Sequence, residues 1–146
     1  MKNRIKKSII IIMCIILLDQ LSKYLIKVNL DWHEPKVLIE NIASLTLTKN
    51  TGGAFSIFQE NNLLLFFAGI LITITLFYYL IRADKKEVIP IALIIGGALG
   101  NLLDRALHGG VIDFIQISIW PVFNIADIAI TLGVTMLIIK IIKKDS

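Results

Sequence analysis

The chain is short of the residues that build metal centres and covalent cross-links. Among 146 residues it has one cysteine, Cys14, and two histidines, His33 and His108. A single cysteine excludes an internal disulfide framework and a cysteine-based zinc site, and two histidines without a clustered partner disfavour a histidine metal site. We therefore expect no metal and no cofactor, so any chemistry must come from other side chains.

Charge is also scarce. Only 18% of the residues are charged and 56% are hydrophobic, against about 25% and 45–50% in a typical soluble domain. A domain of this size buries a core but cannot hide so much isoleucine and leucine. The composition argues against an ordinary cytosolic enzyme and against a disordered chain, and it indicates a membrane protein. The excess of basic residues, 15 against 11 acidic, then concerns topology, and we expect no nucleic-acid partner.

Four apolar stretches predict an all-α membrane protein with four transmembrane helices, formed by residues 1–146 as a single membrane domain. At 1.5 Å per residue each stretch makes a helix of roughly 24–28 Å, against about 30 Å of hydrocarbon. The expected helices cover about residues 8–26, 63–81, 88–103 and 125–142. The segments between them on the outer side are 27–62 and 104–124.

Basic residues cluster at the N-terminus, at residues 82–86 and at the C-terminus. With four spans these three regions lie on one side, which carries a net charge of +7, while the remainder carries −3 and the total is +4. Cytoplasmic segments are enriched in Lys and Arg. The sequence therefore predicts that both termini are cytoplasmic and that the two long connecting segments face outward.

The first outer segment predicts a small extracytoplasmic β element between the first and second helices. Residues 42–48 alternate between apolar and hydroxyl side chains, as in a half-buried strand. A turn at 50–53 and a return strand at 54–58 follow, with Phe55 and Phe58 placed to dip into lipid. A hairpin that faces solvent is equally consistent with this pattern.

Polar residues gather near the outer ends of the expected helices, where ionisable groups are costly unless they have a partner or a task. They are Asp19, Gln20, Lys23, Asn101, Asp104, Arg105, Asp113, Asn124 and Asp127.

Each of these residues also has a purely structural explanation. Asp19 and Lys23 are spaced as a helical ion pair, Asn124 and Asp127 suit a helix N-terminus, and Asn101 with Arg105 could hold Asp104. Gly96 and Gly100 suit close helix packing, whereas Gly97 could leave room for an incoming chain. Together, unpaired carboxylates beside a polar cluster at one depth favour chemistry.

Two carboxylates without a metal or an activated serine or cysteine suggest an aspartyl protease. Two close carboxyl groups share a proton, so one activates water and the other protonates the peptide group. Asp113 and Asp127 are the candidates, because a loop separates them and allows them to converge. Asp104 is interpreted as a supporting residue.

The sequence resembles bacterial lipoprotein signal peptidase, also called signal peptidase II, across nearly the whole chain. Five blocks occur in order: Asp19-Gln20-x-x-Lys23, Asn50-x-Gly52-x-Ala54-Phe55, Gly97-x-x-x-Asn101-x-x-Asp104-Arg105, Gly110-Val111-Ile112-Asp113-Phe114 and Phe123-Asn124-x-Ala126-Asp127. One departure is that the stretch from Ile115 to Val122 is short.

The resemblance implies an aspartic endopeptidase of the bacterial cytoplasmic (inner) membrane, with its active site near the outer face. It implies removal of signal peptides from diacylglyceryl-modified prolipoproteins by cleavage before the lipid-modified cysteine, and inhibition by globomycin-type cyclic peptides. It implies a β-cradle and a small mobile helix over the site, for which segment 27–62 is the candidate.

The resemblance also implies site residues. The catalytic pair maps onto Asp113 and Asp127, and the other functional positions map onto Asp19, Lys23, Asn50, Gly52, Gly97, Asn101, Asp104, Arg105 and Asn124. Asn124 would orient the pair, Arg105 and Asn50 would contact the substrate backbone, and the rest would hold the site.

Two other functions remain open from the residues. A small four-helix proton-coupled transporter would use Asp19 or Asp127 as its proton carrier, although transporters tend to place such groups at mid-membrane and to carry internal repeats. A non-enzymatic membrane scaffold would need its carboxylates only as partners for Lys and Arg.

Overall fold

The computed structural model describes residues 2–52 and 61–144 and contains four long apolar helices, each able to cross a membrane. They are α1 (Lys2–Asn29), α2 (Asn62–Arg82), α3 (Val88–His108) and α4 (Ile125–Lys144). This confirms the predicted class of a four-helix membrane protein. Several helices extend beyond the predicted spans, α1 at both ends and α3 at its C-terminal end. Hydrophobicity marks only the part that crosses lipid, whereas backbone hydrogen bonding continues the helix into polar sequence.

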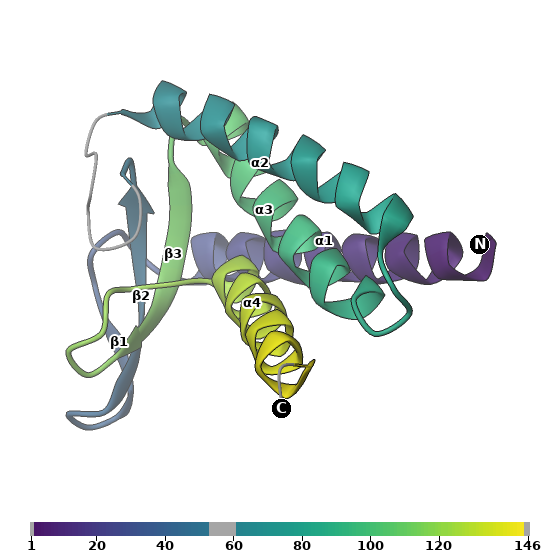
Figure 1. The fold of residues 1–146 in the computed structure, drawn as a ribbon. Helices are drawn as coiled ribbons and strands as arrows, with labels where there is room; N and C mark the ends of the chain where they lie inside the picture. The colour runs from purple at the N-terminus through teal and green to yellow at the C-terminus, as the bar shows by residue number, and fades with distance from the viewer. Residues whose placement is uncertain (1, 53–60, 145–146) are drawn as a thin grey trace.

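Helix α3 lies at the centre and is the most buried of the four spans. It packs against α1, α2 and α4, and Figure 1 shows α2 and α4 on different sides of it. Small residues allow close contact: a Cβ on Gly96 would lie 2.9 Å from Ile15, and one on Gly133 would lie 2.6 Å from the Pro90 carbonyl oxygen. Helices in lipid associate by such tight packing.

A three-stranded antiparallel sheet lies at one end of the helices (Figure 1). Its order is β1 (Lys36–Ile39), β2 (Ala43–Asn50) and β3 (Val111–Ile117). Strand β2 overlaps the strand expected at 42–48 and continues two residues further, to Asn50. The return strand expected at 54–58, with Phe55 and Phe58, lies outside the described residues.

The β element predicted between the first two helices is present as β1 and β2, and the structure adds a third strand, β3, from the segment between α3 and α4. Residues 111–114 are all buried, so this part of β3 is covered on both faces. A strand covered on both faces does not show the alternation of apolar and polar side chains that marks a half-buried strand. The local sequence therefore did not predict β3 or its pairing with β2.

Candidate active site

The four helices and the sheet meet at the C-terminal ends of α1 and α3, and the predicted site residues gather there. Helix α1 supplies Asp19 and Lys23, α3 supplies Gly97, Asn101, Asp104 and Arg105, and the N-terminus of α4 supplies Asn124 and Asp127. Strand β2 ends in Asn50, with Gly52 just beyond it, and β3 carries Asp113.

A buried lysine lies at the base of the site. The Lys23 ammonium is 2.7 Å from the Asp19 carboxylate and 2.8 Å from that of Asp104, and the Lys23 side chain is only 3% exposed. The expected Asp19–Lys23 pair is thus present, but it is part of a larger cluster. The structural cluster expected around Asp104 extends beyond its own helix, because Asp104 binds Lys23 across the helix interface.

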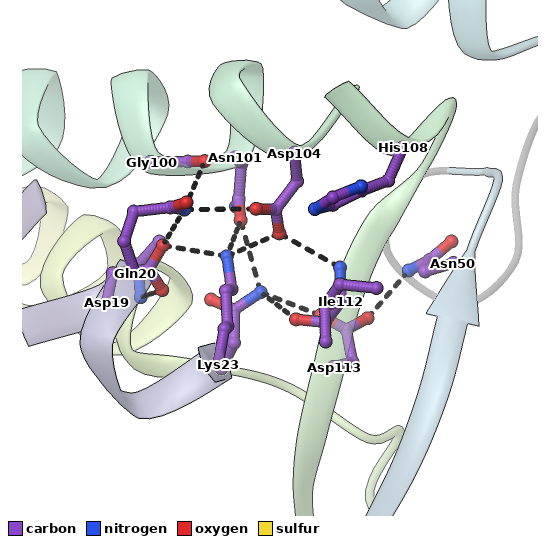
Figure 2. A network of polar contacts seen from close by, with 12 residues as sticks. Asp19, Gln20, Lys23, Asn50, Gly100, Asn101, Asp104, His108, Ile112 and Asp113 are labelled. Atoms are coloured by element: carbon purple, nitrogen blue, oxygen red, sulfur yellow. Dashed lines mark hydrogen bonds and ion pairs between the residues drawn. The ribbon is translucent and has the colours of Figure 1, made fainter. Parts of the chain in front are cut away.

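Gln20 completes this cluster, and sequence reasoning did not include it among the site residues. Figure 2 shows its amide between Asp19, Asp104 and the Gly100 carbonyl. The Gln20 nitrogen donates to these three oxygens at 3.2, 3.0 and 3.3 Å. The signal was a second polar side chain beside Asp19 within an apolar run.

Two glycines allow this approach of the helices. A Cβ on Gly100 would lie 2.7 Å from the Asp19 carboxylate, so Gly100 makes space for the buried acid. A Cβ on Gly97 would clash with the Ala126 carbonyl oxygen and with Ile130 of α4. The space beside Gly97 is thus filled by α4, and the expectation that it admits an incoming chain is wrong.

Two asparagine amides connect the buried cluster to the predicted catalytic carboxylates. The Asn101 carbonyl oxygen accepts hydrogen bonds from Lys23 (3.3 Å) and Asn124 (3.1 Å), which turns its nitrogen toward Asp127 (2.9 Å). The Asn124 nitrogen also donates to Asp113 at 2.7 Å. Each amide orientation is therefore set by its partners, and both carboxylates receive a defined donor.

The N-terminus of α4 is a capping box built from site residues. The Asp127 backbone N–H donates to the Asn124 side-chain oxygen (2.9 Å), and the Asn124 N–H donates to the Asp127 carboxylate (3.2 Å). Asp19 accepts the Ala126 N–H at 3.0 Å. These contacts satisfy orphan donors of the helix terminus and hold Asp127 at its positive end. The structural explanation of Asn124 and Asp127 is therefore correct and compatible with a role in chemistry.

Asp113 is buried on β3, with 3% of its surface exposed. Its carboxylate accepts from Asn50 (3.1 Å) and from Asn124, while the Asn50 oxygen accepts the Gly52 N–H (2.9 Å). Burial raises the pKa of Asp113 from 3.8 to about 7; the charge of Asp127 adds to the rise, and the amide hydrogen bonds oppose it. A carboxyl with this pKa can hold a proton near neutral pH.

A cavity of about 640 Å³ opens beside the two aspartates. Its lining combines polar groups with apolar ones from the segment before α4 and from α4 itself. The residues that line it include Asn50, Gly52, Asn101, Arg105, Asp113, Trp120, Phe123, Asp127, Ile130 and Thr131.

Arg105 ties this cavity to the end of β2. Its Nη2 donates to the Gly52 carbonyl at 3.1 Å, and its Nε is buried without a hydrogen-bond partner among residues 2–52 and 61–144. In the same described part of the chain, no group of three or more His, Cys, Asp and Glu side chains is arranged to hold a metal ion. The arrangement offers two carboxyl groups, oriented amides and a guanidinium around one cavity.

The short stretch from Ile115 to Val122 folds back to bring the two aspartates together. Ile115 and Phe123 exchange backbone hydrogen bonds of 2.8 and 3.0 Å. This bridge joins β3 to the segment that enters α4, so Asp113 and Asp127 approach from the two sides of one turn. A short connection is what this geometry needs.

Comparison with known proteins identifies relatives over almost the whole chain. The family model described as signal peptidase (SPase) II matches residues 11–143. The lipoprotein signal peptidase of Syntrophus aciditrophicus is 38% identical, with 90% of this chain and 89% of the relative covered. That of Staphylococcus aureus is 34% identical, with 99% and 93% covered.

Solved structures agree with the sequence relatives. One bacterial membrane enzyme superposes with a TM-score of 0.91 at 34% identity, covering 97% of this chain and 91% of its own. A second superposes with a TM-score of 0.86 at 34% identity, covering 95% and 94%.

Proposed function

This chain belongs to the signal peptidase II family, whose members are membrane aspartyl proteases that remove signal peptides from prolipoproteins, and from this premise we propose that Asp113 and Asp127 are its catalytic pair. The observation that carries the proposal is that both carboxyl groups line one cavity while Asn124 contacts both of them. The transporter alternative has no support from the relatives.

We assign the general base to Asp127 and the general acid to Asp113. Asp113 is more deeply buried than Asp127, and its pKa of about 7 favours the protonated form, which suits a general acid. Asp127 lies in the first turn of α4 at the wall of the cavity, where its oxygens already accept hydrogen bonds from Asn101 and from the Asn124 backbone N–H. We therefore give Asp127 the other role, that of the base.

The reaction follows from this division. The Asp127 carboxylate takes a proton from water as the water oxygen forms a bond to the scissile carbonyl carbon, and Asp113 gives its proton to the carbonyl oxygen. The tetrahedral intermediate then collapses, the C–N bond breaks, and the amine leaves with the proton that Asp127 carried. Asp113 recovers its proton from the new carboxyl group, so the pair returns to its starting state.

The substrate that this site suits is a diacylglyceryl-modified prolipoprotein, cut before the lipid-modified cysteine. The cavity joins Asp113 and Asp127 to Ile130 and Thr131 of α4, a helix able to cross the membrane. Acyl chains can remain among membrane lipid while the peptide bond reaches the carboxylates. We assign Arg105 to the substrate backbone and expect globomycin-type cyclic peptides to compete for this cavity.

The supporting residues act through the catalytic pair. Asn50, Asn101 and Asn124 orient its two carboxylates, and Asp19, Lys23 and Asp104 form the buried base below them. Gly52 accepts from Arg105, and Gly97 lets α4 approach α3. The direct test is release of signal peptide from a diacylglyceryl-modified prolipoprotein by the purified protein in lipid, with no release from the same precursor lacking its lipid.

The pH dependence follows from the raised pKa of Asp113. Because the folded value of about 7 exceeds the usual 3.8, the folded protein binds this proton more tightly than the unfolded chain does. Stability is then highest below about pH 4 for this group and is lost as the pH rises toward 7. We expect Asp113→Asn to remove this loss, so its melting temperature should exceed that of the parent more at pH 8 than at pH 5.

The rate of cleavage should depend on the same protonation of Asp113. Turnover should fall as the pH rises through about 7, because Asp113 then loses the proton that it donates. The apparent pKa values of this profile describe the pair of aspartates and not either residue alone. Thermal unfolding and initial rates measured across this range check both statements. A rate that keeps rising to pH 9 would contradict the assignment of Asp113 as the acid.

We place the protein in the bacterial cytoplasmic membrane as one domain of residues 1–146, with both termini cytoplasmic and the catalytic pair near the outer face. The partition of charge, +7 against −3, supports this orientation. Reporter fusions after Lys86 and Lys144 should therefore read cytoplasmic, and fusions near Glu40 or His108 should read external. An external C-terminus would rule out the arrangement and the common depth of the carboxylates.

A further inference from the structure

The end of the sheet remote from α2 carries a group of exposed apolar side chains that neither the fold nor the catalytic pair requires. Two turns meet there: Ser118 on the turn after β3 donates its N–H to the Ile42 carbonyl at 2.8 Å, between β1 and β2. The exposed apolar residues in these turns and at the strand ends beside them are called the apolar rim. They are Ile39, Ile42, Ile117, Ile119 and Trp120.

The backbone of the second turn holds its side chains outward. Ser118 has φ of 45°, in the left-handed region that a residue with a Cβ rarely adopts. The next residue, Ile119, is 99% exposed, and Trp120 is 61% exposed. The backbone hydrogen bond between Ser118 and Ile42 keeps the exposed side chains of both turns together, and an exposed apolar group of this kind indicates a surrounding that is not water.

The rim is continuous with the membrane-spanning part of the protein. From Trp120 the chain runs through Pro121 to Phe123 and directly into α4 at Ile125. Figure 1 shows the strands running across the ends of the helices, with the turn that follows β3 projecting beside the start of α4. The rim therefore lies near the depth at which α4 enters the membrane, where tryptophan is enriched.

We propose that the apolar rim inserts into the outer leaflet of the membrane and seats the sheet on lipid. The depth is shallow, because Glu40 and Asn41 lie between Ile39 and Ile42 at the tip of the first turn and belong at the level of the head groups. Lipid is favoured over a protein partner because the rim is continuous in sequence with α4, a helix long and apolar enough to cross a membrane.

The rim also has a consequence for the reaction, and this part rests on the proposed function. Trp120 belongs to the rim and also lines the cavity. Phe123 and Ile130 line the cavity with it. Lipid at the rim therefore reaches the cavity entrance, and a substrate anchored by acyl chains approaches along it. Loss of rim insertion should weaken capture of substrate and leave the chemical step unchanged.

The first experiment uses tryptophan fluorescence, because the chain has only Trp32 and Trp120. Trp32→Phe leaves Trp120 as the single tryptophan in the full-length protein in vesicles, and excitation at the red edge of the absorption band avoids the three tyrosines. Lipids brominated near the glycerol end of the acyl chains should quench Trp120 strongly, and lipids brominated near the methyl end should quench it less. Adding Ile119→Asp should reduce the quenching, whereas Ile119→Val should preserve it.

Two results would overturn the proposal. Quenching by acrylamide in water but not by brominated lipid would place the rim in solvent. Protection from both quenchers that disappears when the protein is diluted in lipid would assign the rim to a second copy of the chain. Neither reading needs catalysis, so failure here is distinguishable from failure of the proposed function.

The second experiment measures cleavage of a diacylglyceryl-modified prolipoprotein in vesicles. Ile119→Asp should raise KM about tenfold, as expected when a charge replaces an isoleucine side chain in contact with lipid, and should leave kcat and the melting temperature unchanged. Ile119→Val should match the parent. An unchanged KM for Ile119→Asp, or a fall in kcat with KM constant, would contradict the role given to the rim.

Discussion

Replacing Asp113 or Asp127 by asparagine is expected to abolish most signal-peptide release, by roughly 10³-fold or more, while the protein stays folded. General acid and base catalysis typically contribute about 10²–10⁴-fold each. An amide at either position cannot take the proton from water or return one to the peptide group. Asparagine keeps the shape of aspartate and most hydrogen bonds of the site, so helix α4 and strand β3 should remain in place.

The measurement is single-turnover cleavage of a diacylglyceryl-modified prolipoprotein by each purified variant, together with thermal unfolding and lipopeptide binding. Binding should persist, since Arg105 and the apolar wall of the cavity are unchanged. The double variant should be little slower than either single variant, because residues that act as one unit show non-additive losses. Asp31→Asn, an exposed acid outside the cavity, is the matched control and should cleave normally.

Asp104→Asn separates support from catalysis. Asp104 contacts Lys23, Gln20 and the Ile112 N–H, and it is not among the residues that line the cavity. Its replacement should lower stability along with rate. Near-normal turnover in a folded Asp113 or Asp127 variant would refute the catalytic assignment and direct attention to Asp104 or Asp19.

Replacing Lys23 by methionine is expected to have the largest effect on stability. The variant leaves the carboxylates of Asp19 and Asp104 buried without the cation that lies 2.7 and 2.8 Å from them. Removing one partner from a buried ion pair costs about 3–5 kcal/mol. Activity should fall with stability, because Asn101 also loses the Lys23 contact that helps to orient its amide toward Asp127.

Lys27→Met is the matched control for this prediction. Lys27 lies one turn further along α1, and its amine is exposed, near His108, so its loss should change the melting temperature little. The triple variant Asp19→Asn, Lys23→Met, Asp104→Asn should recover part of the lost stability by removing the uncompensated charges. If Lys23→Met alone is as stable as the parent protein, the cluster does not support the site.

Asp19 gives a second comparison within the same cluster. Asp19→Ala removes a partner of Lys23 and the acceptor for the Ala126 N–H at the start of α4. Asp19→Asn retains an oxygen for that N–H, so it should be milder in both stability and turnover. Equal and negligible effects of the two changes would show that Asp19 has neither role.

The amino-acid sequence by itself determined the class of the protein and its family, and it supplied the residues proposed for its site. Long apolar runs predict membrane helices because burying them in lipid outweighs any soluble arrangement. The ordered polar blocks identified the family and named Asp113 and Asp127, and the alternation at 42–48 predicted strand β2. These inferences depend on local composition and spacing, which remain readable without knowledge of how the helices pack.

The tertiary structure decided which polar groups meet. Lys23 was paired in sequence with Asp19, but it also binds Asp104 of α3, and Gln20 joins them. Asp19 accepts a backbone N–H from Ala126, 107 residues away. The pairing of β3 with β2 and the packing of α4 beside Gly97 are also contacts between segments far apart in the sequence. Contacts of this kind depend on the distance and angle at which helices cross, which follow from packing of the whole chain and leave no periodic mark in the residues that make them.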